Sequence, residues 1–259
     1  MNNTPLLSFH QLSFSYPQKK AEQSQIVLKD LSFTIQQGEF VSILGPSGSG
    51  KSTIFRLITG LEKQIAGDIT FQKETNGNRL GKVGLMPQQD MLLEWRTVLD
   101  NVILPLEVSG KSKKEANEIA LSFFPSFGLQ GTEKKYPHQL SGGMKQRASF
   151  LRAMLGGSEL LLLDEPFSSL DAMTKLTMQE WLLAKWDELN STILFITHDV
   201  DEALFLSDRI ILFTETPLTT FEEISLPLRR PRSIDDLLTQ ELTELKRSIL
   251  NRLRQKVSV

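Results

Sequence analysis

The sequence contains no cysteine, which excludes disulfide bridges and thiolate metal sites. It also lacks long apolar runs, because the longest, such as 160–163 and 210–213, are far shorter than the roughly 20 residues that span a bilayer. Neither sign of charge is in excess, since 29 basic and 31 acidic residues leave a net charge of −2. A nucleic-acid binder usually carries a clear basic excess, so we expect no nucleic-acid partner.

The first ten residues do not resemble a signal peptide. Any action at a membrane therefore requires a partner.

Short apolar segments alternate with helical patterns along the chain. The first part of the sequence alternates apolar and polar side chains, as strands do. Helical spacing dominates from 96 to 155 and again over 173–189. Near-continuous apolar strands separated by helices are typical of an α/β fold, whose parallel sheet is covered on both faces. The later strands are predicted at 40–44, 67–71, 82–86, 160–163, 192–197 and 209–213.

A glycine-rich loop follows the apolar strand FVSIL and precedes the apolar helix IFRLITGL. Its glycines allow successive backbone N–H groups to surround a polyphosphate, and the helix N-terminus adds partial positive charge. We expect Lys51 to reach the terminal phosphates, Ser52 to coordinate Mg²⁺ and Thr53 to contact the first phosphate. Alone, the loop indicates only a nucleoside triphosphate. The predicted phosphate-binding residues are Gly45, Pro46, Ser47, Gly48, Ser49, Gly50, Lys51, Ser52 and Thr53.

Two further strand ends carry groups suited to phosphate chemistry. The strand LLLL is followed by Asp164 and Glu165. We expect Asp164 to provide a second metal contact and Glu165 to polarise an attacking water, whereas a solvated strand end is the simpler alternative. The strand TILFIT ends at His198, which either senses the γ-phosphate or is an ordinary surface histidine. His10 and His138 receive no catalytic role.

The segment LSGGMKQR, residues 140–147, would open a helix whose free N–H groups form an anion site. It resembles the signature motif of ABC-type ATPases, and the other motifs of that family stand in the same order. The resemblance implies that this segment acts on ATP held by a second copy of the chain, so that two ATP molecules lie between two chains. The signature residues are Ser141, Gly142, Gly143 and Gln146.

The same resemblance assigns roles elsewhere. In MPQQD, Gln88 is expected to contact metal and water, with Gln89 as the alternative. SSLD resembles the loop whose Asp171 contacts the dimer partner, and His198 matches the family's switch histidine. An aromatic ring is expected to stack on adenine, and the candidates are Tyr16 and, as the alternative, Phe14. The expected cofactors are ATP and Mg²⁺, with Ser52, Gln88 and Asp164 holding the metal.

The resemblance implies a P-loop NTPase (RecA-like) core sheet with an antiparallel β subdomain and an inserted α-helical subdomain, plus a C-terminal helix. We expect the ATPase domain over 6–218, with the helical insertion at about 90–155, and an extension over 219–259. Ser233 is predicted to begin the terminal helix. Its apolar stripe should pack on the flank of the domain, and a membrane-surface helix is the alternative. The stripe is Ile234, Leu237, Leu238, Leu242, Leu245, Ile249 and Leu253.

Residues 92–107, LLEWRTVLDNVILPLE, resemble a segment of importer ATPases for nitrate, aliphatic sulfonates, taurine and thiamine pyrimidine precursors. Glu94 stands where that segment usually has proline. The resemblance implies that Trp95, Val98 and Leu99 receive a permease helix, although a role in the core is the alternative.

The partners implied are a second copy, transmembrane permease subunits and, indirectly, an extracellular solute-binding protein, with the chain peripheral at the cytoplasmic face of the membrane. The transported solute is not indicated, because in this arrangement it never touches the ATPase. The alternative functions are a non-transport ABC ATPase, acting on a soluble or cell-envelope assembly, and a catalytically idle scaffold.

Overall fold

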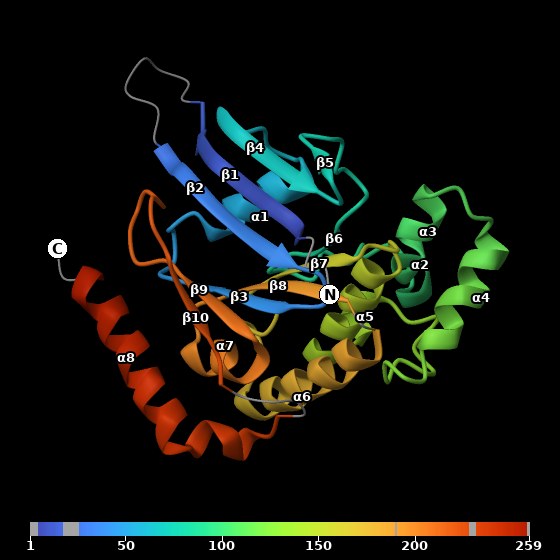
Figure 1. The fold of residues 1–259 in the computed structure, drawn as a ribbon. Coiled ribbons are helices and arrows are strands. Elements are labelled where there is room, and N and C mark those ends of the chain that lie inside the picture. The colour runs from blue at the N-terminus through green and yellow to red at the C-terminus, as the bar shows by residue number, and fades with distance from the viewer. Residues whose placement is uncertain (1–4, 18–25, 190, 228–231, 258–259) are drawn as a thin grey trace. The chain divides into compact units, whose positions relative to one another are not determined.

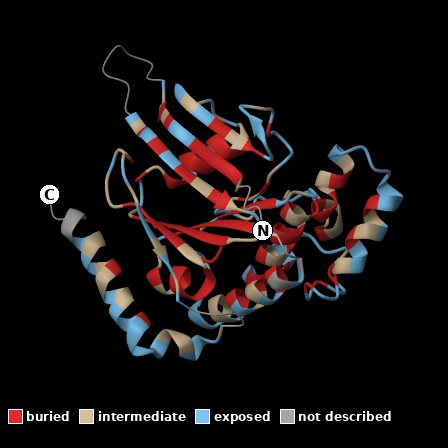
Figure 2. Ribbon diagram, viewed as in Figure 1, coloured by how far each residue is buried: buried red, intermediate tan, exposed pale blue. Residues whose placement is uncertain are grey.

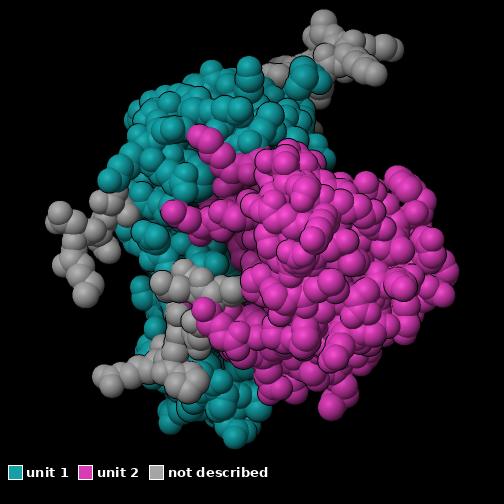
Figure 3. All heavy atoms as spheres, turned by 90° about the vertical axis from the view of Figure 1, so that its right-hand side faces the viewer, with its two compact units in different colours: residues 1–80, 190–259 teal, residues 81–189 magenta. Residues whose placement is uncertain are grey.

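The computed structural model describes residues 5–17, 26–189, 191–227 and 232–257 (Figure 1). These residues form two compact units (Figure 3). Unit 1 comprises residues 1–80 and 190–259, and unit 2 comprises residues 81–189. Within the described residues, no helix is both long enough and apolar enough to cross a membrane.

Unit 1 contains an antiparallel sheet in the order β2-β1-β4-β5. Its strands are β1 (Pro5–Ser15), β2 (Ile26–Gln36), β4 (Ala66–Phe71) and β5 (Glu74–Thr75). Alternate side chains are buried in the second half of β2 and at the end of β4, as period-two patterning predicts. In β1 residues 6–9 are all buried, so both faces of that strand are covered there. Phe9 and Phe33 pair across β1 and β2 with ring centroids 4.5 Å apart. The apolar alternation at the start of the sequence therefore forms one face of this sheet.

Unit 1 also contains strands ordered β10-β9-β3-β8. The parallel members are β3 (Phe40–Leu44), β8 (Thr192–Thr197) and β9 (Arg209–Leu212), and β10 (Glu222–Ser225) runs antiparallel to β9. Every residue of β3 and β8 is buried, and Figure 2 shows these central strands in the colour of buried residues. The helices of this unit are α1 (Lys51–Thr59), α7 (Val200–Leu206), the short η2 (Ile234–Leu238) and α8 (Gln240–Val257). Apolar runs of this length therefore form a sheet covered on both faces, as predicted.

Unit 2 pairs β6 (Gly84–Met86) in parallel with β7 (Leu160–Asp164). Its aromatic core includes Phe127, Phe150 and Trp181, with ring centroids 5.1–6.1 Å apart. Its helices are α2 (Val98–Val102), α3 (Leu104–Val108), α4 (Lys113–Phe123), the short η1 (Pro137–Gln139), α5 (Gly142–Met154) and α6 (Ala172–Leu189). The predicted helical stretch is thus present, divided into short helices.

The C-terminal helix differs from the prediction. Ser233 begins only the single turn η2, and the helix restarts after Thr239, whose ψ of 149° is extended. Leu242 and Ile249 of α8 are buried against α7 and the strands beside it, whereas Leu238 is 79% exposed. Leu237 and the stripe from Leu242 onward pack on the flank, as expected. The break at Thr239 rotates Leu238 out of it.

This break generates a stability prediction. Leu242→Ala should lower the free energy of unfolding by about 2–4 kcal/mol, because it removes a fully buried side chain. Leu238→Ala is the matched control and should change it by less than about 0.5 kcal/mol. Urea unfolding of the full chain measures both values. Equal losses would contradict the placement of the two leucines.

Candidate functional site

The loop between β3 and α1 is shaped by close backbone approaches. A Cβ atom at Gly45 would lie 2.8 Å from the carbonyl oxygen of Phe213, and one at Gly50 would lie 2.5 Å from Val27. Gly50 also has a φ of 104°, a conformation that glycine adopts without steric cost. These two glycines let the chain turn directly from the buried strand into the helix.

The N-terminus of α1 is suited to an anion. No side chain caps it and its first turn contains no acidic residue, so its N–H groups and helix dipole favour a phosphate there. The Lys51 ammonium donates to the carbonyl oxygens of Gly45 (2.9 Å) and Pro46 (2.7 Å). Ser52 is exposed on the first turn, as a metal-binding hydroxyl requires. The residues of the predicted loop therefore fit a polyphosphate with a bound metal.

The two candidates for the adenine-stacking ring differ in burial. Phe14 is 2% exposed and belongs to the core. Tyr16 is half-buried, and its hydroxyl lies 3.2 Å from that of Thr53 in the first turn of α1. The edge of one ring meets the face of the other at 4.9 Å. Of these two candidates, Tyr16 is the one whose side chain reaches both solvent and the first turn of α1.

His198 lies beside the phosphate loop because of strand register. In the parallel pair of β3 and β8, Leu44 is opposite Thr197. The next residues along the two strands are Gly45, the first residue of the loop, and His198, which is exposed. The carboxyl ends of parallel strands meet at one edge of a sheet, where ligands bind in α/β folds.

The predicted carboxylates of unit 2 occupy an equivalent strand edge. Met86 of β6 is opposite Leu163 of β7, so the residues that follow the two strands emerge together. The Gln88 amide donates to the Glu165 carboxylate at 3.1 Å. This contact brings the predicted metal and water ligands together, and it involves Gln88, the preferred of the two glutamines.

Glu165 has an unusual backbone conformation. Its φ is 45°, in the left-handed region that residues other than glycine rarely adopt. Its carbonyl oxygen accepts hydrogen bonds from the backbone N–H of Ser168 (3.2 Å) and from the Ser168 hydroxyl (2.9 Å). Such strain persists where the surrounding contacts fix it and is frequent at functional sites. Because of this tight turn, the chain changes direction at Glu165, directly after Asp164 ends the strand.

The signature segment caps a helix as predicted. The Ser141 hydroxyl accepts from the N–H of Met144 at 3.3 Å, and α5 begins at Gly142. Ser141 and Gly142 are exposed. A Cβ at Gly143 would lie 3.2 Å from Thr174 on α6, and Gln146 is 4% exposed. The exposed surface of the motif is therefore its first turn, while Gly143 and Gln146 face inward.

Asp171 directly precedes α6, just as Ser141 directly precedes α5. Its carboxylate accepts from the N–H of Thr174 at 3.1 Å. Hydrogen bonds from the side chain and backbone of Thr174 hold the pKa of Asp171 below its usual range. The carboxylate is exposed and charged at neutral pH, which is compatible with the predicted contact to another chain.

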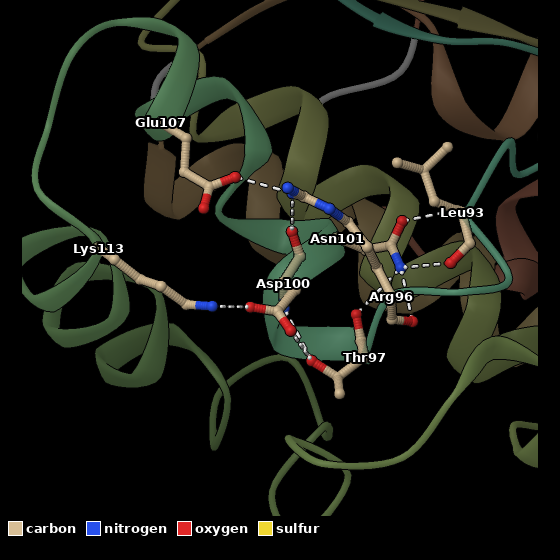
Figure 4. A network of polar contacts seen from close by, with 7 residues as sticks. All are labelled: Leu93, Arg96, Thr97, Asp100, Asn101, Glu107 and Lys113. Carbon is tan, nitrogen blue, oxygen red and sulfur yellow. Dashed lines mark hydrogen bonds and ion pairs between the residues drawn. The ribbon is translucent and has the colours of Figure 1, made fainter.

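A polar network holds the segment that carries Trp95 (Figure 4). Buried Asn101 accepts from the N–H of Leu93 (2.7 Å), and its amide donates to the carbonyl oxygens of Leu93, Arg96 and Thr97 at 3.0–3.2 Å. Thr97 caps α2. The four hydrogen bonds of one side chain fix the backbone on both sides of Trp95.

Ion pairs extend this network. Arg96 pairs with Glu107 at 2.7 Å, and Lys113 pairs with Asp100 at 2.9 Å. The hydrogen bond from Lys113 is the main cause that lowers the pKa of Asp100, although burial opposes it. The network thus ties the segment to α3 and α4.

The three residues of this segment that are expected to contact a permease helix differ in their burial. Trp95 is 76% exposed, whereas Val98 is fully buried. Leu99 is half-buried and borders a cavity of about 590 Å³. Val98 therefore belongs to the core, and Trp95 is presented to solvent on a fixed backbone.

Two side chains that the sequence analysis does not identify, Arg152 and Ser149, also hold the loop that begins at Gln88. Arg152 of α5 donates to the carbonyl oxygens of Asp90 (2.6 Å) and Met91 (2.7 Å), and the Ser149 hydroxyl donates to Asp90 at 3.0 Å. Residues three apart lie on the same face of a helix. The spacing of Ser149 and Arg152 is therefore the feature of the sequence that indicates a shared contact. The helix that begins at the signature segment thereby anchors the loop that begins at Gln88.

Comparison with known proteins agrees with this geometry. The ABC transporter family model matches residues 28–168. The chain is 51% identical to the formylaminopyrimidine import ATP-binding protein ThiZ of Halalkalibacterium halodurans, over 94% of each chain. It is 43% identical to the aliphatic sulfonates import ATP-binding protein SsuB 1 of Rhodococcus jostii, over 88% of each. The predicted resemblance to this importer branch is confirmed.

A solved structure supports the same conclusion. The dimeric ATP-binding cassette MJ0796, in a post-hydrolysis state bound to ADP and Pi, is 30% identical and has a TM-score of 0.74, covering 86% of this chain and all of that one. The predicted P-loop NTPase fold is thereby confirmed. The chain belongs to the ABC transporter family and is an ATP-hydrolysing member of it.

Proposed function

We propose that this chain is the ATPase subunit of an importer, working as a dimer around two ATP molecules and driving separate permease subunits. The observation that carries the proposal is the 51% identity, over nearly the whole chain, to an import ATP-binding protein. That relative is named for formylaminopyrimidine, so a small pyrimidine precursor of thiamine is the first solute to test. An extracellular binding protein would deliver the solute to the permease.

The roles of the residues follow from their chemistry. The phosphate loop binds the polyphosphate through its N–H groups and Lys51, while Tyr16 stacks on the adenine. Glu165 accepts a proton from the attacking water, and the loss of this proton makes the water a better nucleophile. His198 contacts the γ-phosphate, so its position differs between bound and hydrolysed states. Exposed Ser141 and Gly142 present the N-terminus of α5 to the ATP of the second copy.

The residues that would hold Mg²⁺ are Ser52, Gln88 and Asp164. The ABC ATPase family binds ATP, generally with this metal. The ion would neutralise charge on the phosphate oxygens. A hydroxyl, an amide and one carboxylate suit it, because Mg²⁺ prefers oxygen ligands and takes few from protein when phosphates supply others.

Trp95 is the proposed anchor for the permease. It is an exposed aromatic side chain on a backbone fixed by Asn101, and such anchors carry much of the energy of protein interfaces. A fixed backbone reduces the entropy lost on binding. Contact with the permease would place the chain at the cytoplasmic face of the membrane, as a peripheral protein.

Glu165→Gln should retain ATP binding but lower turnover by about 10²–10⁴-fold, because the amide cannot accept the proton of the attacking water. ATP should then hold the chain as a dimer, measured by size-exclusion chromatography with bound nucleotide. Glu159→Gln is the matched control at the opposite end of β7 and should hydrolyse ATP normally. Normal hydrolysis by Glu165→Gln would refute its assigned role.

Affinity purification from gently solubilised membranes tests the importer proposal directly. The chain should recover a polytopic membrane protein at about one copy per ATPase subunit. Trp95→Ala should reduce that recovery by at least about tenfold, the loss typical of an interface anchor. Leu238→Ala, which removes a comparably exposed apolar side chain, should not. Recovery of soluble partners only would favour the non-transport ABC ATPase instead.

A further inference from the structure

Glu202 is a buried carboxylate with no role in the mechanism above. It lies in the first turn of α7, four residues after His198, and is 4% exposed. Burying a charged group is costly unless hydrogen bonds compensate it. Its burial beside the strand that delivers His198 therefore calls for a structural or functional reason.

The contacts of Glu202 enclose the turn that carries His198. The hydroxyl of buried Thr197 donates to the Glu202 carboxylate. The same hydroxyl oxygen accepts from the N–H of Asp199 at 3.0 Å. The Asp199 carboxylate accepts in turn from the N–H of Glu202 at 3.4 Å and from that of Asp201 at 2.9 Å. The residues before and after His198 are thus joined in a closed ring of hydrogen bonds.

This ring determines the direction in which His198 leaves the sheet. Thr197 is the last residue of β8 and is held by its pairing with Leu44. The ring fixes the next two backbone positions relative to α7, and His198 itself remains exposed. Linked hydrogen bonds in a buried setting reinforce one another and favour one conformation.

We propose that Glu202 is a positioning residue for His198, acting through the Thr197 hydroxyl and the Asp199 backbone. The inference rests on the proposed contact of His198 with the γ-phosphate. Without the ring, the imidazole would sample several positions at the edge of the phosphate loop. Turnover would fall, while ATP binding, which depends on the loop itself, would change little.

A double-mutant cycle tests this coupling in the full chain. Glu202→Ala and Thr197→Val should each lower kcat by about tenfold, the effect of one lost buried hydrogen bond, with KM for ATP nearly unchanged. In a His198→Ala background, neither change should lower kcat further. Glu202→Gln keeps an acceptor oxygen and should restore most of the loss. Asp201→Ala removes a neighbouring acid outside the ring and is the control for general damage to α7.

A spectroscopic measurement separates the possible failures. The chain has three histidines, so the imidazole NMR signals of His198 can be assigned by their loss in His198→Ala. Glu202→Ala and Thr197→Val should shift or broaden them, leaving those of His10 and His138 unchanged. Unchanged His198 signals, or losses of kcat that multiply in the double variants, would overturn the positioning role. Full activity of His198→Ala alone would instead refute the proposed role of His198.

Discussion

The parallel pairing of β3 with β8 is the constraint on which the rest of the structure depends. By placing Leu44 opposite Thr197, it brings the phosphate loop and His198 to the same edge of a sheet. The pairing of β6 with β7 does the same in unit 2 for Gln88 and Glu165. Each unit thus presents reactive groups at the carboxyl ends of buried strands, where ligands bind in α/β folds.

Much of this arrangement could be predicted from the sequence, because the lengths of the apolar segments and their burial determine it. The strands 40–44 and 192–197 are near-continuous apolar runs, and their observed bounds coincide with the predicted ones. The phosphate loop is recognisable because glycine is required at Gly45 and Gly50 by contacts that leave no space for a side chain. The predicted C-terminal stripe is wrong at Leu238, since helical spacing continues through Thr239 although the backbone does not.

The remaining features depend on tertiary hydrogen bonds, which no periodic pattern encodes. Asn101 directly follows Asp100 in the sequence, and nothing local shows that it holds the backbone around Trp95. Arg152 contacts the loop at Asp90 across a long stretch of sequence. Phe14 and Tyr16 are close in sequence, and they are distinguished by the burial of Phe14 and by the contact of the Tyr16 hydroxyl with Thr53. Such contacts determine the directions in which side chains point, whereas the strand ends only bring those side chains near one another.

Mixing two inactive variants tests the central claim, that the signature segment of one copy serves the phosphate loop of another. Lys51→Ala disables a phosphate loop and Ser141→Arg disables a signature segment, so each purified variant should be inactive. A mixed dimer contains one intact pair when the two segments act in trans, and an equal mixture should recover about a quarter of the wild-type ATPase rate if subunits combine at random. No recovery in dimers shown to have exchanged subunits would mean that each chain completes its own site.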